Sequence, residues 1–120
     1  MNSIAAKFFS FILKNNQNRI SQEEARNNMK NDKNILLIDV RSPREYKQAH
    51  IPRSKLIPLD KLEREAEKKL SKERTIYVYC HTGMRSKRTV KILQNKGFEK
   101  VFNIGGMNTW IYEKEYNSKV

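Results

Sequence analysis

The stretch that decides the fold is TIYVYCHTGMRS, residues 75–86. Its first half is β-branched and aromatic, which is typical of a strand, and this strand ends on Cys80, the only cysteine of the chain. A short loop containing Gly83 follows, Arg85 closes the loop, and a basic helix-forming segment comes next. Backbone N–H groups and a helix N-terminus beside a thiol lower its pKa, so we expect Cys80 to be a reactive thiolate.

Strands and helices alternate on both sides of this stretch. We expect three strands and a short extended piece, at residues 35–40, 75–79, 101–104 and 55–58. We expect helices from the Ser21 cap to residue 30, from residue 43 to the break at 50–52, from an Asp60 cap over 61–70, and over 86–96. Gly105-Gly106 predicts a tight turn before a last helical stretch that carries Trp110, whose ring we expect in the core. This alternation indicates parallel βαβ units and an α/β fold, with Cys80 at the carboxyl end of its strand.

Composition limits the classes of function. The chain has 120 residues, enough for one core, and a formal net charge of +12. Lysine and arginine are spread along the chain, so we interpret the charge as a solvated surface and expect no nucleic-acid partner. The positive field favours small anionic substrates. A single cysteine with two histidines excludes an internal disulfide and a Cys-x-x-Cys pair and argues against a structural zinc site, so any sulfur acceptor must come from outside.

The first eighteen residues differ from the rest. Ile4, Phe8, Phe11 and Ile12 share one helical face, which predicts an amphipathic helix and linker over residues 1–18, followed by a domain over 19–120. The helix is too short to span a bilayer, and three roles remain open: packing on its own domain, self-association, or contact with a membrane surface. A lone reactive thiol suits a reducing cytoplasm, which is the compartment we expect.

Three segments together resemble a single-domain rhodanese, a sulfurtransferase. They are LIDVRSPREY (37–46) followed by HIP (50–52), CHTGMRS (80–86) continuing to Leu93, Gly97 and Phe98, and VFNIGGM (101–107) followed by Trp110. The resemblance implies a central parallel sheet flanked by helices on both faces. It also implies that Cys80 takes a sulfane sulfur from a donor such as thiosulfate, becomes a persulfide, and passes the sulfur to a thiol, cyanide or protein acceptor, without a cofactor or metal.

The same resemblance places further residues in the site. Substrate-binding positions are expected along the loop, at His81, Thr82, Gly83, Met84, Arg85 and Ser86. Arg85 either holds an anionic donor or fixes the loop through a side-chain hydrogen bond. Structural support is expected from Asp39, Arg41 and His50. The family usually has glycine before the histidine and Gly-Ala after the proline, where this chain has Ala49, Arg53 and Ser54, so the conformation of that turn is left open.

Loop length separates the closest alternatives. Four residues lie between Cys80 and Arg85, whereas cysteine-dependent phosphatases have five, and the shorter ring fits a sulfur atom better than a phosphoryl group. The main alternative is a rhodanese-like module that carries sulfur or binds a protein without turnover. A phosphatase is the more distant alternative.

Overall fold

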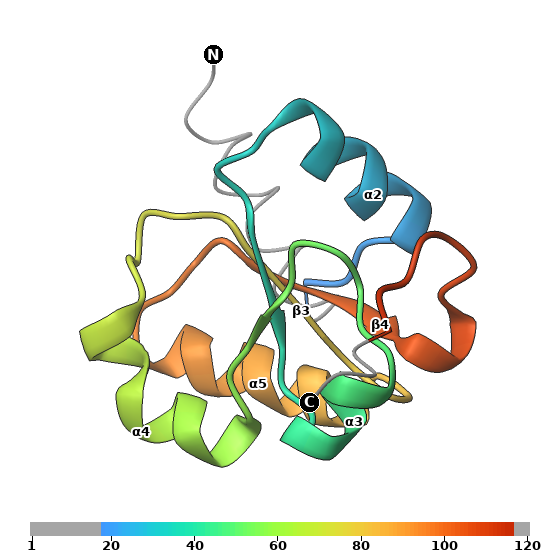
Figure 1. Ribbon diagram of the computed structural model, residues 1–120. Helices are drawn as coiled ribbons and strands as arrows, with labels where there is room; N and C mark the ends of the chain where they lie inside the picture. The colour runs from blue at the N-terminus through green and yellow to red at the C-terminus, as the bar shows by residue number, and fades with distance from the viewer. Residues whose placement is uncertain (1–17, 117–120) are drawn as a thin grey trace.

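A computed structural model describes residues 18–116, and its centre is a four-stranded, wholly parallel sheet (Figure 1). The strands lie in the order β2-β1-β3-β4. Their bounds are β1 Leu36–Asp39, β2 Lys55–Leu56, β3 Ile76–Cys80 and β4 Val101–Gly106. The predicted α/β fold with a parallel sheet is therefore confirmed, and β3, which ends on Cys80, is an inner strand.

Helices cover both faces of this sheet, as the sequence predicted (Figure 1). Their bounds are α2 Gln22–Asn31, α3 Pro43–Gln48, α4 Leu59–Lys69, α5 Met84–Asn95 and the 3-10 helix η1 Met107–Thr109. One buried cluster joins α4 and α5 to the sheet, and a second joins α2 and Trp110 to the opposite face. Burial on two sides explains why the β3 sequence is apolar at nearly every position.

Local capping sets two of the helix starts. The side chain of Ser21 accepts a hydrogen bond from the N–H of Glu24 and caps α2. Ser42 and Glu45 form a reciprocal capping box at α3, with Pro43 as its first residue. Both pairs bond within one helical turn, which is why these starts could be expected from the sequence.

Three local predictions were wrong. Helix α4 begins at Leu59 with Pro58 as its cap, and Asp60 makes no capping bond, because the Pro58 carbonyl already starts the helical ladder. Helix α5 begins at Met84, two residues earlier than expected, because Gly83 turns the chain straight into the helix. Gly105 and Gly106 belong to β4, where Gly106 pairs with Cys80 of β3 after a register shift, so the chain leaves the sheet later, through η1.

The N-terminal boundary of the described residues bears on the amphipathic helix predicted from the sequence. The amphipathic helix predicted over residues 1–18 falls almost entirely in residues 1–17, outside the described part. Asn18 is buried and donates a side-chain hydrogen bond to the carbonyl of Val101, so the packed chain already contacts β4 there. Within residues 18–116, no helix is long and apolar enough to cross a membrane.

Candidate active site

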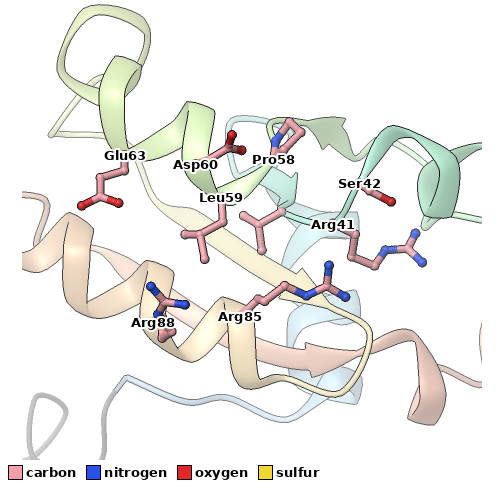
Figure 2. A pocket seen from close by; sticks show the side chains of 9 residues that line it. Arg41, Ser42, Pro58, Leu59, Asp60, Glu63, Arg85 and Arg88 are labelled. Carbon is pink, nitrogen blue, oxygen red and sulfur yellow. The ribbon is translucent and has the colours of Figure 1, made fainter.

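An open cleft of about 370 Å³ lies at the carboxyl edge of the sheet, between α4 and the start of α5 (Figure 2). Its lining comes from the ends of β1 and β2 and from both helices: Val40, Arg41, Ser42, Pro58, Leu59, Asp60, Glu63, Arg85 and Arg88. Clefts at this edge are the usual ligand sites of open α/β sheets. The loop that follows β3 forms one border of the cleft.

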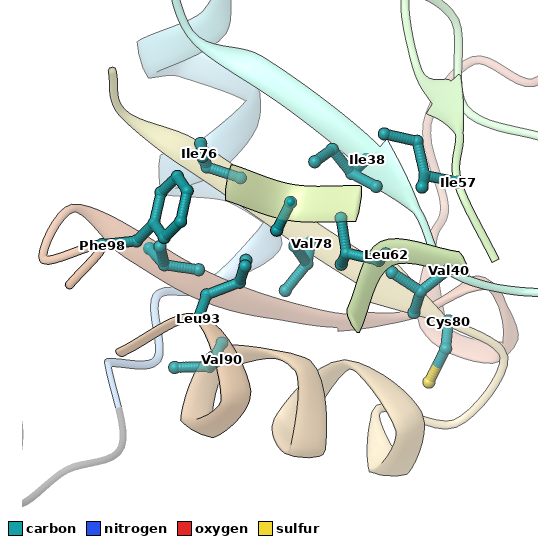
Figure 3. Packing of buried hydrophobic residues seen from close by; sticks show 12 residues of the cluster. Ile38, Val40, Ile57, Leu62, Ile76, Val78, Cys80, Val90, Leu93 and Phe98 are labelled. Carbon is teal, nitrogen blue, oxygen red and sulfur yellow. The ribbon is translucent and has the colours of Figure 1, made fainter. Parts of the chain in front are cut away.

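Cys80 ends β3 and begins this loop, residues 80–86, which we call the cysteine loop. The side chain points from the sheet toward the first turn of α5 (Figure 3), and the residue is 1% exposed. The Gly83 N–H donates a hydrogen bond to Sγ at 3.0 Å, and the Ser86 hydroxyl lies 3.5 Å from Sγ. Sγ therefore leaves the apolar core and ends among hydrogen-bond donors.

These donors decide the pKa of the thiol. Burial of Cys80 alone would raise its pKa. The hydroxyl of Ser86 and the backbone N–H groups of Ser86, Gly83 and Arg85 stabilise the anion, and together they outweigh burial and lower the pKa below its ordinary value. The buried sulfur is thus favoured as a thiolate.

Two glycines give the cysteine loop its shape. Gly83 has a φ of +99°, a conformation that side chains disfavour, and this turn aims its N–H at Sγ. Gly106, on β4, lies so close to the loop that a Cβ there would overlap the His81 carbonyl and approach the N–H of Thr82. The loop therefore needs one glycine within it, Gly83, and one on the neighbouring strand, Gly106.

Asn103 anchors the loop from β4 and was missed by the sequence analysis. Its Oδ1 accepts hydrogen bonds from the Ser86 hydroxyl at 2.7 Å and from the Gly105 N–H at 2.9 Å. Its Nδ2 donates to the Gly83 carbonyl at 3.2 Å. The buried amide of Asn103 thus holds two residues that donate to Sγ, Gly83 and Ser86. Its place two residues before the Gly-Gly pair is the only local signal that could have suggested this role.

Arg85 is fixed by a carboxylate that was also missed. Its guanidinium makes two parallel hydrogen bonds, both 2.9 Å long, to the Glu45 carboxylate of α3. Arg85 lowers the pKa of Glu45 to about 2, so the carboxylate stays charged. Of the two roles considered for Arg85, this side-chain geometry favours fixing the loop, while its backbone N–H faces the sulfur.

Of the three expected support residues, Arg41 lines the cleft, whereas Asp39 and His50 are not part of its lining. Asp39 accepts hydrogen bonds from the backbone N–H of Arg41 at 2.9 Å and from its guanidinium at 2.7 Å, and both residues are buried. His50 stacks on Tyr46, and its ring nitrogens contact the Tyr46 carbonyl and the Glu115 carboxylate. Neither Asp39 nor His50 makes a hydrogen bond to Sγ. The contacts of both are those of residues that support the fold around the site.

The remaining residues of the cysteine loop lie at the protein surface. His81, Thr82 and Met84 are exposed, and Met84 is 66% exposed. None of their side chains makes a hydrogen bond to Sγ. Within residues 18–116, no group of three metal-ligating side chains is present. Among the described residues, the site therefore offers backbone and hydroxyl donors around a sulfur, and no imidazole makes a hydrogen bond to that sulfur.

The turn in which this chain departs from the rhodanese pattern, residues 50–54, is called the arginine turn below. Arg53 occupies it with a φ of +72°, which is uncommon for a residue other than glycine. Its guanidinium donates to the carbonyls of Met29, Lys33 and Ile35, the first bond being 2.6 Å long. The turn that the sequence left open is thus a glycine-type turn held by an arginine side chain.

Comparison with known proteins agrees with this geometry. Residues 21–113 match the Rhodanese-like domain family. The chain is 36% identical over 97 residues to YrkF of Bacillus subtilis, which is provisionally named a sulfur carrier protein; the match covers 80% of this chain and 52% of YrkF. It is 34% identical over 79 residues to the thiosulfate sulfurtransferase GlpE of Coxiella burnetii, covering 65% of this chain and 73% of GlpE.

A solved structure shows the same fold. The rhodanese-like domain protein of Staphylococcus aureus superposes with a TM-score of 0.74 at 31% identity, covering 84% of this chain and 99% of that one. The chain spans only about half the length of YrkF, so what the rest of YrkF does has no counterpart in the aligned region.

Proposed function

The chain belongs to the rhodanese-like domain family, and on that premise we propose that it is a sulfurtransferase that moves a sulfane sulfur through a persulfide on Cys80. Its relatives include proteins named for thiosulfate sulfurtransfer and for sulfur carriage. The observation that carries the proposal is the set of donors around Sγ. They favour a sulfur anion at the end of β3 without an acid or base beside it.

The first step loads the sulfur. The Cys80 thiolate attacks the outer sulfur of thiosulfate, a new S–S bond forms, and the old S–S bond breaks with its electron pair leaving on sulfite. Charge is conserved, because one thiolate and one dianion become one persulfide anion and one sulfite dianion. The N–H groups of Gly83, Arg85 and Ser86, which favour a sulfur anion at Sγ, support this step.

The second step unloads it. An acceptor thiol passes its proton to the outer sulfur of the persulfide and attacks this sulfur as a thiolate. The bond to Sγ breaks, the electron pair stays on Sγ, and the acceptor leaves as a hydropersulfide. The cycle ends with the Cys80 thiolate that began it and needs no oxidant or metal.

Mass spectrometry of the intact chain tests the proposal. After incubation with thiosulfate we expect a mass gain of one sulfur atom, which is lost on addition of cyanide. Cys80→Ser should show no gain, and Lys91→Gln, an exposed α5 residue outside the cysteine loop and the cleft lining, should load like the wild type. No adduct on the wild-type chain, or an adduct that survives in Cys80→Ser, would refute the assignment.

A second candidate is a sulfur carrier that unloads only onto a partner protein. It is favoured by the similarity to YrkF and by the deep burial of Cys80. It predicts a persulfide that small thiols remove slowly. Fast multiple turnover with thiosulfate and a small thiol would exclude this candidate.

A further inference from the structure

The cleft beside the cysteine loop has walls of opposite charge (Figure 2). Arg85 and Arg88 project from α5, while Asp60 and Glu63 project from α4 on the other side. A sulfurtransferase site built only for dianionic sulfur compounds needs no carboxylates at its mouth, because they repel such ligands. The carboxylates therefore indicate another kind of ligand.

Two of the three arginines that line the cleft are already neutralised. Asp39 pairs with Arg41, and Glu45 pairs with Arg85 through two hydrogen bonds. A bidentate arginine–carboxylate pair has little charge left for a further anion. Arg88 is thus the cleft cation that remains to bind one.

The carboxylates of α4 lack comparable partners. Among residues 18–116, Glu63 and Arg88 make no ion pair within 4 Å. Asp60 has one long contact of 3.8 Å to Arg64, and both side chains are well exposed. The cleft therefore presents one cation and two anions that are not tightly paired.

This balance contrasts with the rest of the protein. Lysine and arginine outnumber aspartate and glutamate by 25 to 13 over the chain. The three cleft arginines, however, are met by four carboxylates when Asp39 and Glu45 are included. The excess of positive charge found over the chain does not extend into the cleft. The cleft is therefore complementary to a ligand that carries both a positive and a negative group.

We propose that the cleft binds the sulfur acceptor, and that the acceptor is a small thiol carrying both an ammonium and a carboxylate group, as cysteine does. This inference rests on the proposed sulfurtransfer. Glu63 and Asp60 receive the ammonium, and Arg88 receives the carboxylate. The thiol lies toward Val40, which shares a buried cluster with Cys80, and toward Arg85, whose N–H faces Sγ.

The test compares four acceptors on the same persulfide-loaded, full-length chain. Cysteine carries both charges, cysteamine lacks the carboxylate, mercaptopropionate lacks the ammonium, and mercaptoethanol lacks both. Thiols differ in intrinsic reactivity, so each variant is compared with the wild type for one thiol at a time. The measured quantity is kcat/KM for loss of the extra sulfur.

Glu63→Gln should lower kcat/KM for cysteine and cysteamine by about two- to fivefold, the size expected of a partly exposed ion pair. It should not lower the value for mercaptopropionate or mercaptoethanol. Arg88→Gln should do the converse, lowering the value for cysteine and mercaptopropionate only. Glu67→Gln and Lys91→Gln make the same charge changes on α4 and α5 outside the cleft lining, and they should show no such selectivity.

An equal change for all four thiols, or none, would overturn the inference. Thiosulfate loading of the wild-type chain is measured first, so a failure of the sulfurtransfer itself is recognised separately. Binding of S-methylcysteine, which accepts no sulfur, provides a test that does not need the reaction. Backbone amide shifts near Glu63 and Arg88 that Arg88→Gln weakens support the cleft, and the absence of shifts refutes it.

Discussion

The cysteine loop and the arginine turn both bend the chain through positive φ, but with different residues. Gly83 has a φ of +99° and Arg53 a φ of +72°. In the cysteine loop the backbone N–H groups themselves bind the sulfur, and their turn needs the positive φ that glycine adopts without strain. In the arginine turn a side chain with three carbonyl partners compensates for the strain. Glycine is thus required where the backbone performs the chemistry, and is replaceable where a side chain can hold the turn.

Gly106→Ala is expected to have the largest effect on the cysteine loop. The new methyl group would overlap the His81 carbonyl and press on the Thr82 N–H, both of which are backbone. We expect the free energy of unfolding to fall by about 1–3 kcal/mol, as for other overpacked sites. Persulfide loading should fall more steeply, because the N–H groups move away from Sγ. Urea unfolding and mass spectrometry measure the two effects, and unchanged loading would contradict this picture.

Gly83→Ala tests the turn directly. An alanine at this φ costs about 1–2 kcal/mol of stability. Relief of that strain would rotate the 83 N–H away from Sγ, so we expect slower sulfur loading and a higher pKa of Cys80. Alkylation rates across pH report the pKa.

Gly97→Ala is the matched control for this variant. Gly97 ends the α5 region with a φ of +96°, and the atoms nearest to a Cβ there belong to the flexible Lys72 side chain. Its stability cost should resemble that of Gly83→Ala, while loading and alkylation should stay as in the wild type. Equal loss of loading in both variants would mean that stability alone explains the result.

The comparison also explains what the sequence could predict. Strand β3, the Cys80 position and the glycine in its loop follow from local pattern, since period, β-branching and turn chemistry all lie within a dozen residues. The pairs that hold the site do not. Asn103 lies 17 positions from Ser86, and Glu45 lies 40 positions from Arg85. Contacts of that kind depend on how the strands are ordered, which a local pattern does not specify.

The glycine pair 105–106 shows the same limit of local patterns, because here the local pattern led to a wrong prediction. Two adjacent glycines favour a turn locally, and a turn was predicted. In the fold both glycines belong to β4. Gly105 has a φ of +97° where the β3–β4 register shifts, and Gly106 pairs with Cys80 and passes close to the His81 carbonyl. A packing requirement therefore overrode the local preference.

Ser86→Ala should produce a smaller effect, on the pKa of Cys80. The hydroxyl has one proton, and Asn103 Oδ1 at 2.7 Å is a nearer acceptor than Sγ at 3.5 Å. Three N–H donors would remain, so we expect the midpoint of alkylation by iodoacetamide to move to higher pH while loading persists. A midpoint that stays in place would show that the hydroxyl serves Asn103 alone.

The same thiol gives a pH dependence of stability. Its pKa is lower in the folded chain than the value near 8.5 expected when unfolded. The thiolate therefore stabilises the fold above the unfolded pKa, and this contribution is lost as pH falls through the folded pKa. The stability difference between wild type and Cys80→Ser should grow in favour of the wild type as pH rises through that window. A difference that is flat with pH would contradict the lowered pKa.

The smallest effect is expected at Arg53, where two opposing changes can be separated. Arg53→Ala keeps a side chain at positive φ and removes the hydrogen bonds to Met29, Lys33 and Ile35, so it should lower stability by about 1 kcal/mol. Arg53→Gly removes the same bonds but relieves a strain of about 1–2 kcal/mol, partly offset by the greater freedom of glycine when unfolded. It should therefore be the more stable of the two variants and lie close to the wild type, with sulfur loading unchanged in both. If the two variants unfold at the same urea concentration, the strain is absent, and the arginine side chain is not what replaces the missing glycine.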